Sequence, residues 1–320
     1  MRSALRVVPT GMAMTALLFA GQGSQMVGMG KDLAESFPAA QSIFNRANEV
    51  LGYDLAKVCF EGPDDALTQT KNAQPGIFLI SWAALEILKS QVPSLKPEAM
   101  AGLSLGEFTA LTAAGVMSLE DGLKVVRQRG QFMQEACEAT DGGMAAIIGL
   151  DEEATREVCE EAGVELANLN CPGQLVISGA SAAIEQACEL AKEKGAKRAL
   201  PLTVAGAYHS RLMKSASPKL ETALREIPLN LPNVTVISNV TAQPHATGGE
   251  ILNRLVEQVT SPVRWEASIR YLIDHDFTRF IELGPGTALT GFIRRIDRRL
   301  EIHNVADVLS LEKTVAALSA

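Results

Sequence analysis

The segment Gly102-Leu103-Ser104-Leu105-Gly106 constrains the fold of this chain more than any other part of it. A serine between two glycines at this spacing is typical of a sharp turn from a β-strand into an α-helix, which exposes the serine hydroxyl as a nucleophile. A short apolar run precedes the segment, and residues 107–114 are rich in alanine and leucine, which favour a helix. The order therefore predicts strand, turn and helix. An ordinary glycine-bounded turn with a serine cap is the alternative.

Composition limits the classes of protein that the chain can belong to. With 320 residues, of which 47% are hydrophobic, it can bury a large core, and its length indicates two domains or one enlarged by an insertion. The net charge of -8 argues against a general nucleic-acid binder, although a local basic patch can still dock an acidic partner. No apolar run approaches the ~18 residues of a membrane span.

The five cysteines form no CxxC pair and have no histidines at ligand spacing. A disulfide framework or a zinc site is therefore not expected, and an odd number of thiols in a large chain is typical of a reduced, cytoplasmic protein. Arg2 and Arg6 before the apolar residues 14–20 resemble a weak secretory signal. We interpret residues 14–20 instead as the first core strand, because they lead directly into a glycine-rich loop, and residues 1–13 as an N-terminal extension.

The order of expected elements predicts an α/β fold in which one domain is inserted into another. Residues 14–137 and 208–320 alternate between strands and helices, including a helix over residues 77–91, and are expected to form an α/β-hydrolase-like body with a parallel sheet. Residues 138–207 follow the order β-α-β-β-α-β, which is typical of ferredoxin-like domains. A cleft between the body and this inserted small subdomain is the expected site.

A serine nucleophile needs a base, and the chain offers four histidines. His209 lies where the insertion returns to the body and is therefore the candidate, whereas His245 and His275 are expected at the surface and His303 in the core. No acidic residue stands out as the group that orients the base, since Glu107 follows Ser104 too closely to reach across the turn. A main-chain carbonyl can take that role instead.

The loop Gly21-Gln22-Gly23-Ser24-Gln25 follows the first strand and lacks the further glycine or lysine of a nucleotide-binding loop. It is interpreted as the source of a second N–H group for an oxyanion hole, with a tight turn as the alternative.

Six motifs in this order resemble those of malonyl-CoA:acyl carrier protein transacylases, from about Thr15 to the C-terminus. They are Phe19-Ala20-Gly21-Gln22-Gly23-Ser24-Gln25, Gly102-Leu103-Ser104-Leu105-Gly106-Glu107, Arg127-Gln128-Arg129-Gly130, Asn170-Cys171-Pro172-Gly173-Gln174, Tyr208-His209-Ser210 and Glu282-Leu283-Gly284-Pro285-Gly286. Two departures stand out. Leu103 replaces a histidine that many members carry, and Tyr208 replaces a phenylalanine, which places a hydroxyl near the acyl pocket.

The resemblance implies a role for each matching residue. Ser104 would be the nucleophile and His209 its base, with the main-chain carbonyl of Gln258 orienting the imidazole. The N–H groups of Gln22 and Leu105 would form the oxyanion hole. The substrate carboxylate would bind Arg129, because a guanidinium grips it with two parallel hydrogen bonds. Asn170 would line the pocket, and the basic pair Lys197 and Arg198 would dock the carrier protein.

The activity that the resemblance implies is transfer of a malonyl group from CoA to acyl carrier protein through a malonyl-serine intermediate, in fatty acid synthesis. Malonyl-CoA is then a substrate, no metal or other cofactor takes part, and the enzyme is expected to be a monomer that binds neither nucleic acid nor membrane. Three alternatives stay open: a serine acyl hydrolase or thioesterase, a methylmalonyl transferase for polyketide synthesis, and a non-catalytic docking subunit.

Overall fold

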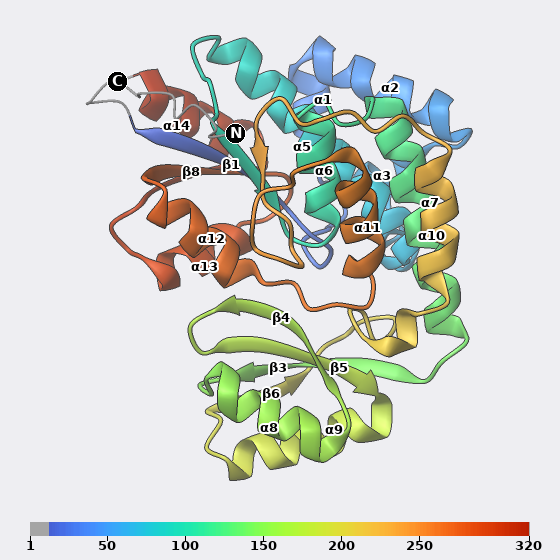
Figure 1. The fold of residues 1–320 in the computed structure, drawn as a ribbon. Helices are drawn as coiled ribbons and strands as arrows, with labels where there is room; N and C mark the ends of the chain where they lie inside the picture. Colours follow the sequence, from blue (N-terminus) through green and yellow to red (C-terminus); the bar gives the residue numbers. More distant parts are fainter. Residues whose placement is uncertain (1–12, 320) are drawn as a thin grey trace.

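The computed structural model describes residues 13–319, and the extension predicted over residues 1–13 therefore lies, except for Ala13, outside the described residues. The described chain is an α/β protein with a parallel sheet and a separate antiparallel sheet, and the predicted class is confirmed at this level. The large sheet lies in the upper part of the molecule and the small sheet in the lower part, as seen in Figure 1.

The large sheet is parallel throughout the described residues and is assembled from both ends of the chain. Its strands lie in the order β7 (Thr235–Val236), β2 (Ala99–Gly102), β1 (Met14–Phe19), β8 (Phe277–Leu283) and β9 (Glu301–Val305). In the register of β1, Phe19 lies between Gly102 and Leu283. The loops that leave β1, β2 and β8 therefore meet at one edge of the sheet, where ligands bind in open α/β sheets.

Helices cover both faces of this sheet because its central strands are buried on both sides. Leu17 and Phe19 face one apolar cluster, and Ala16 and Leu18 face another. The helices are α1 (Lys31–Ser36), α2 (Pro38–Leu51), α3 (Leu55–Glu61), α4 (Asp64–Thr68), α5 (Thr70–Gln91), α6 (Leu105–Ala113), α7 (Leu119–Glu138), α10 (Ala216–Arg225), α11 (Gly248–Gln258), α12 (Trp265–Asp274), α13 (Ala288–Ile296) and α14 (Val308–Ser319), with a short 3-10 turn over Arg211–Met213.

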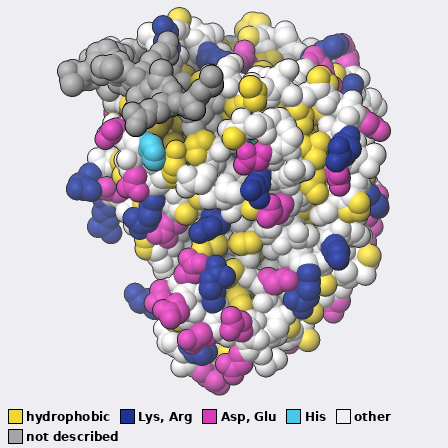
Figure 2. Space-filling view, in the orientation of Figure 1, with side chains coloured by type: hydrophobic (Ala, Val, Ile, Leu, Met, Phe, Trp, Pro, Cys, Tyr) yellow, Lys and Arg dark blue, Asp and Glu magenta, His cyan; other side chains and the backbone are white. Residues whose placement is uncertain are grey.

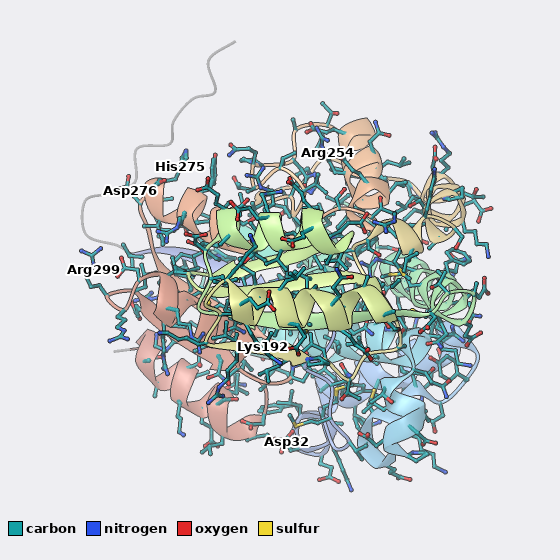
Figure 3. The ribbon with its side chains drawn as sticks, turned by 90° about the horizontal axis from the view of Figure 1, so that it is seen from below. Asp32, Lys192, Arg254, His275, Asp276 and Arg299 are labelled. Atoms are coloured by element: carbon teal, nitrogen blue, oxygen red, sulfur yellow. The ribbon has the colours of Figure 1, made fainter. Side chains whose placement is uncertain are left out.

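The small sheet is antiparallel, with the strand order β4-β5-β3-β6. Its elements follow one another as β3 (Gly142–Ile148), α8 (Glu152–Ala162), β4 (Glu165–Cys171), β5 (Gln174–Ala180), α9 (Ser181–Glu193) and β6 (Arg198–Pro201). Seen from below, α8 and α9 cover the outer face of this sheet, with Lys192 of α9 at the surface (Figure 3). The order of these elements matches the one expected from the sequence.

The small sheet is hydrogen-bonded to the large part of the molecule along β4. The Leu169 N–H donates to the carbonyl of Val263 at 2.9 Å, and the Val263 N–H donates to the carbonyl of Ala167 at 2.8 Å. Helices α12 and α13 pack against the same strand. The segment between α11 and α12 is therefore hydrogen-bonded to the small sheet.

Charges of both signs are interspersed over the face seen in Figure 2, and neither sign forms a continuous patch there. Within residues 13–319 no helix combines the length and the apolar composition needed to cross a bilayer.

Candidate active site

Ser104 stands on a strained turn between β2 and α6. Its φ of 53° and ψ of -102° lie outside the ordinary regions for a residue with a side chain. The turn is tight because a Cβ on Gly102 would lie 1.9 Å from the carbonyl carbon of Gly106, and one on Gly106 would lie 2.1 Å from the carbonyl oxygen of Phe19. The two glycines therefore permit the close approach that presents the serine, as their spacing predicted.

The structure places His209 beside Ser104. Its Nε2 lies 2.8 Å from the serine Oγ, and its Nδ1 lies 2.9 Å from the carbonyl oxygen of Gln258 and 3.1 Å from that of Ser261. Carbonyl oxygens only accept, so Nδ1 carries the hydrogen and the Nε2 lone pair faces the serine hydroxyl. In this geometry a histidine can take a proton from serine while carbonyl oxygens, and not a carboxylate, accept the hydrogen on its Nδ1.

His209 is neutral in this setting. Burial and the positive charge of Arg129 lower the pKa of its imidazole to about 4, against the opposing effect of the two carbonyl groups. The base is therefore unprotonated near neutral pH.

The structure brings Arg129, on α7, to the same serine. Its side chain is 1% exposed and donates hydrogen bonds to Gln74 Oε1 at 2.6 Å, Ser104 Oγ at 3.0 Å and Gln258 Oε1 at 2.9 Å. Burial lowers the pKa of the guanidinium to about 10, which leaves it a cation at neutral pH. All three acceptors are neutral groups, so a buried cation lies against the Ser104 hydroxyl without an ion pair to any carboxylate of the described residues.

The N–H groups of Gln22 and Leu105 are both available at this edge of the large sheet. Leu105 is the first residue of α6, where N–H groups have no partner inside the helix. Gln22 lies in the loop that leaves β1. Neither N–H donates a hydrogen bond to another group within residues 13–319. Gln22 and Ser104 line the same cavity, Leu105 directly follows Ser104, and an oxyanion hole requires two such free donors.

Residues 16–315 match the family model of the acyl transferase domain. The chain belongs to this acyl transferase family. Among its relatives, a malonyl CoA-acyl carrier protein transacylase of Bacillus subtilis is 47% identical over 96% of this chain and 98% of its own. One from Escherichia coli K12 is 42% identical, over 89% of this chain and 93% of its own.

Solved structures agree with the family assignment. A malonyl CoA-acyl carrier protein transacylase of Clostridium perfringens has a TM-score of 0.92 and 40% identity over 96% of this chain and 98% of its own. A malonyl-transacylase solved in complex with a type II PKS acyl-carrier protein has a TM-score of 0.92 and 38% identity, and covers 95% of this chain and 100% of its own. These matches confirm the family resemblance found in the six motifs.

In this acyl transferase, Ser104 lines a cavity of about 760 Å³ between the two sheets. The large part of the molecule contributes Gln22, Ser104 and Phe292 to its lining, and the small sheet contributes Asn168 and Asn170. A cleft between the two parts was expected from the sequence. Asn170 is 6% exposed, and its buried Oδ1 has no partner among the described residues.

The Tyr208 hydroxyl of the acyl transferase is already engaged. It lies close to Thr70 Oγ1 and accepts a hydrogen bond from Gln22 Nε2 at 3.2 Å. The phenolic group therefore ties α5 to the loop that carries the Gln22 N–H, although its ring still lines the cavity.

Lys197 and Arg198 lie at the start of β6, the edge strand of the small sheet, and both are exposed. Neither forms an ion pair with a residue that the structure describes. The same strand leads to Leu202 and Val204 at the mouth of the cavity. The structure thus places the basic pair on an exposed surface. Neither residue lines the cavity that contains Ser104.

Sequence reasoning missed several residues that the structure brings to this site. His245 was expected at the surface, but its side chain is fully buried against Glu107, so this expectation is wrong. His303 was expected in the core, whereas it is half-buried and pairs with Glu301. Gln74 and Asn239 were not singled out. The side-chain oxygen of Asn239 accepts the Ser104 N–H at 2.6 Å. The two residues are 135 positions apart in the sequence, so no local motif can reveal the contact.

Proposed function

We propose that this protein transfers the malonyl group of malonyl-CoA to the phosphopantetheine thiol of acyl carrier protein, in fatty acid synthesis. Ser104 Oγ attacks the thioester carbonyl carbon while His209 takes the hydroxyl proton; the C–S bond breaks, and the proton passes to the leaving CoA thiolate. The N–H groups of Gln22 and Leu105 hold the negative oxygen of the intermediate. The carrier thiol then attacks the malonyl ester, and the same steps run in reverse to free the serine.

The observation that carries this proposal is the buried cation of Arg129, 3.0 Å from the nucleophile and without a carboxylate partner in residues 13–319. A malonyl group brings a carboxylate that pairs with the guanidinium, whereas an acetyl group leaves the charge unpaired. The supporting relatives are malonyl CoA-acyl carrier protein transacylases by name. The proposal involves no metal or other cofactor.

Intact mass measurement tests the proposal. Brief exposure to malonyl-CoA is expected to add one malonyl group to the protein, and carrier protein bearing its phosphopantetheine arm is expected to remove it. Carrier protein that lacks the arm serves as the control, because it has no thiol to accept the group. Absence of the adduct on folded protein would contradict the proposal. Discharge by water alone would favour the hydrolase, and equal labelling by methylmalonyl-CoA would favour polyketide supply.

The pH dependence of acylation follows from the neutral state of His209. Its pKa of about 4 means that the base stays unprotonated as the pH falls from 8 to 5, so the rate of malonyl-serine formation is expected to be flat over this range and to fall near pH 4. Removal of the Arg129 charge, which contributes to that low pKa, moves the fall to higher pH. Rapid-quench acylation after a pH jump measures both. A fall centred near pH 6.5, the ordinary value for histidine, would contradict the assignment.

The same pKa has a consequence for stability. The imidazole takes up its proton near pH 6.5 in the unfolded chain and only near pH 4 in the folded one. The contribution of the neutral base to stability is therefore present above pH 6.5 and is lost as the pH falls toward 4.

We further propose the finer division of the fold that the sequence indicated. Residues 14–137 and 208–320 form an α/β-hydrolase-like body, and residues 138–207 form a ferredoxin-like small subdomain. The β-α-β-β-α-β order and the strand order β4-β5-β3-β6 support the second name. The carrier protein is proposed to dock at Lys197 and Arg198, with Asn170 contacting the acyl-pantetheine group. We propose that the enzyme works in the cytoplasm as a monomer.

A further inference from the structure

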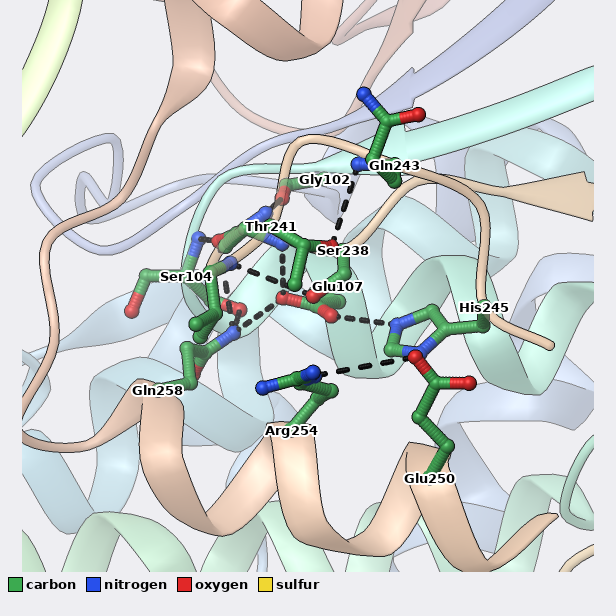
Figure 4. A network of polar contacts seen from close by, with 12 residues as sticks. Gly102, Ser104, Glu107, Ser238, Thr241, Gln243, His245, Glu250, Arg254 and Gln258 are labelled. Carbon is green, nitrogen blue, oxygen red and sulfur yellow. Dashed lines mark hydrogen bonds and ion pairs between the residues drawn. The ribbon is translucent and has the colours of Figure 1, made fainter. Parts of the chain in front are cut away.

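A fully buried carboxylate lies one helical turn behind the nucleophile. Glu107 is in the first turn of α6, and both of its oxygens are engaged. Oε2 accepts the Asn239 N–H at 3.0 Å and the Gln258 Nε2–H at 2.7 Å, and Oε1 lies 2.7 Å from His245 Nε2 (Figure 4). Glu107 does not touch His209, so it is no direct member of a catalytic triad.

Two of the partners of Glu107 hold the reacting residues. Gln258 donates a hydrogen bond from Nε2 to the Ser104 carbonyl at 3.0 Å, and its Oε1 accepts one from the Arg129 guanidinium. Its main-chain oxygen orients His209. Asn239 accepts the Ser104 N–H through Oδ1 and donates through Nδ2 to the Gly102 carbonyl at 2.7 Å. One carboxylate therefore holds both residues that fix the turn and the cation, Asn239 by its main-chain N–H and Gln258 by its side chain.

A carboxylate gives Gln258 a defined direction. An amide side chain has a donor end and an acceptor end of nearly the same shape, and it can turn either one toward a neighbour. Glu107 only accepts hydrogen bonds, so the NH2 end of Gln258 must face it and the oxygen must face Arg129. In the opposite orientation two donors would meet at Arg129 and two acceptors at Glu107.

Glu107 also supplies a countercharge. Its negative charge acts on the Arg129 guanidinium and opposes the lowering of the arginine pKa by burial. The direct acceptors of Arg129 are neutral, so this carboxylate, which contacts the Gln258 amide, is a nearby anion that stabilises the buried cation. A buried cation with a nearby anion is far less costly than an isolated one.

We propose that Glu107, held in place by His245, is a positioning residue that fixes the Gln258 amide and thereby keeps Arg129 directed at the acyl group. The inference rests on the proposed malonyl transfer and deepens it. Selection of the acyl group by its carboxylate then depends on a residue that touches neither the substrate nor the arginine.

His245 completes the arrangement from the other side. Its side chain is fully buried, and its Nδ1 has no hydrogen-bond partner among the described residues. Since Glu107 Oε1 can only accept, Nε2 carries the hydrogen. The imidazole therefore donates to the carboxylate and holds it in the orientation that serves Gln258.

The test compares malonyl-CoA and acetyl-CoA as acyl donors in the Glu107→Gln variant. This substitution keeps the shape of the side chain and one acceptor but removes the charge and the carboxylate acceptor of the Gln258 NH2 group. The ratio of malonyl to acetyl acylation rates, measured by rapid quench, is expected to fall by about 10- to 100-fold. A merely structural role would lower both rates in proportion and leave the ratio unchanged, which would overturn the inference. Glu257→Gln, which changes an exposed carboxylate of the same helix as Gln258, is the matched control.

A double-mutant cycle tests whether Glu107 acts through Gln258. Gln258→Met removes the amide and keeps the main-chain carbonyl that orients His209. In that background Glu107→Gln is expected to have no further effect on the ratio, and full additivity would overturn the inference.

A second pair of variants keeps the inference testable if Glu107→Gln does not fold. His245→Leu removes the donor to Glu107, while His245→Gln retains one at a similar position. The ratio is expected to fall in the first variant and to recover in the second; equal ratios in both would overturn the inference. Failure of the wild-type protein to form any malonyl adduct would instead contradict the proposed function.

Discussion

Replacement of Ser104 by alanine is expected to abolish the covalent malonyl adduct and to lower transfer by at least about ten-thousandfold, because no other hydroxyl of the described site lies within hydrogen-bond distance of the His209 base. The loss is expected in chemistry and not in folding. The Ser104 N–H keeps its bond to Asn239, and its carbonyl keeps its bond to Gln258. Intact mass and steady-state transfer measure the effect, and thermal unfolding shows that the variant is folded.

Ser178→Ala provides the matched control for this variant. Ser178 is a fully buried serine on β5 whose hydroxyl has no partner among the described residues, so its removal is expected to leave adduct formation and transfer unchanged. A malonyl adduct that persists on Ser104→Ala at the wild-type rate would show that another residue is the nucleophile.

Replacement of Arg129 by alanine is expected to lower malonyl acylation by about 100- to 5000-fold, which corresponds to ~3–5 kcal/mol for the loss of one partner of a buried ion pair. Acetyl acylation is expected to change far less, because that group makes no ion pair, and the preference for malonyl is therefore lost. Arg129→Lys restores the charge without the paired donors and is expected to recover only part of the rate. Acylation rates with the two acyl-CoA donors measure the change.

Arg127→Ala is the control from the same helix. Arg127 is only half-buried and lies over the Tyr53 ring, away from Ser104, so its removal is expected to leave the preference intact. Equal losses for malonyl and acetyl donors in Arg129→Ala would indicate that the arginine supports the turn and does not bind a carboxylate. Some loss of stability is expected in either case, since Gln74 and Gln258 lose their donor.

The parts of the site that sequence could predict are those with a local signature. The glycines around Ser104 indicate a tight turn because their spacing is a steric requirement, and the order of strands and helices in the small sheet follows from their alternation along the sequence. The resemblance to one family then supplied Arg129 and the Gln258 carbonyl, which lie on separate helices and share no pattern.

The supporting layer could not be predicted because its contacts cross the chain. Asn239 and His245 are each more than 130 residues from the groups they hold, and a single buried histidine gives no periodic signal. Gln74 lies on a helix that was predicted over residues 77–91 but begins at Thr70. Pro75 lies inside this helix, although proline is usually a mark of a helix end.

The close approach of Gly102 and Gly106 makes the turn around Ser104 intolerant of substitution, in contrast to other parts of the cavity lining. Any side chain at either glycine would collide with main-chain atoms, which have no room to withdraw. The cavity is also lined by side chains away from these glycines in the sequence, among them Leu202, Val204 and Phe292, and these can change in size without altering the two glycines. New ligand preferences can therefore be selected at those positions, while the turn that carries the serine is inherited unchanged.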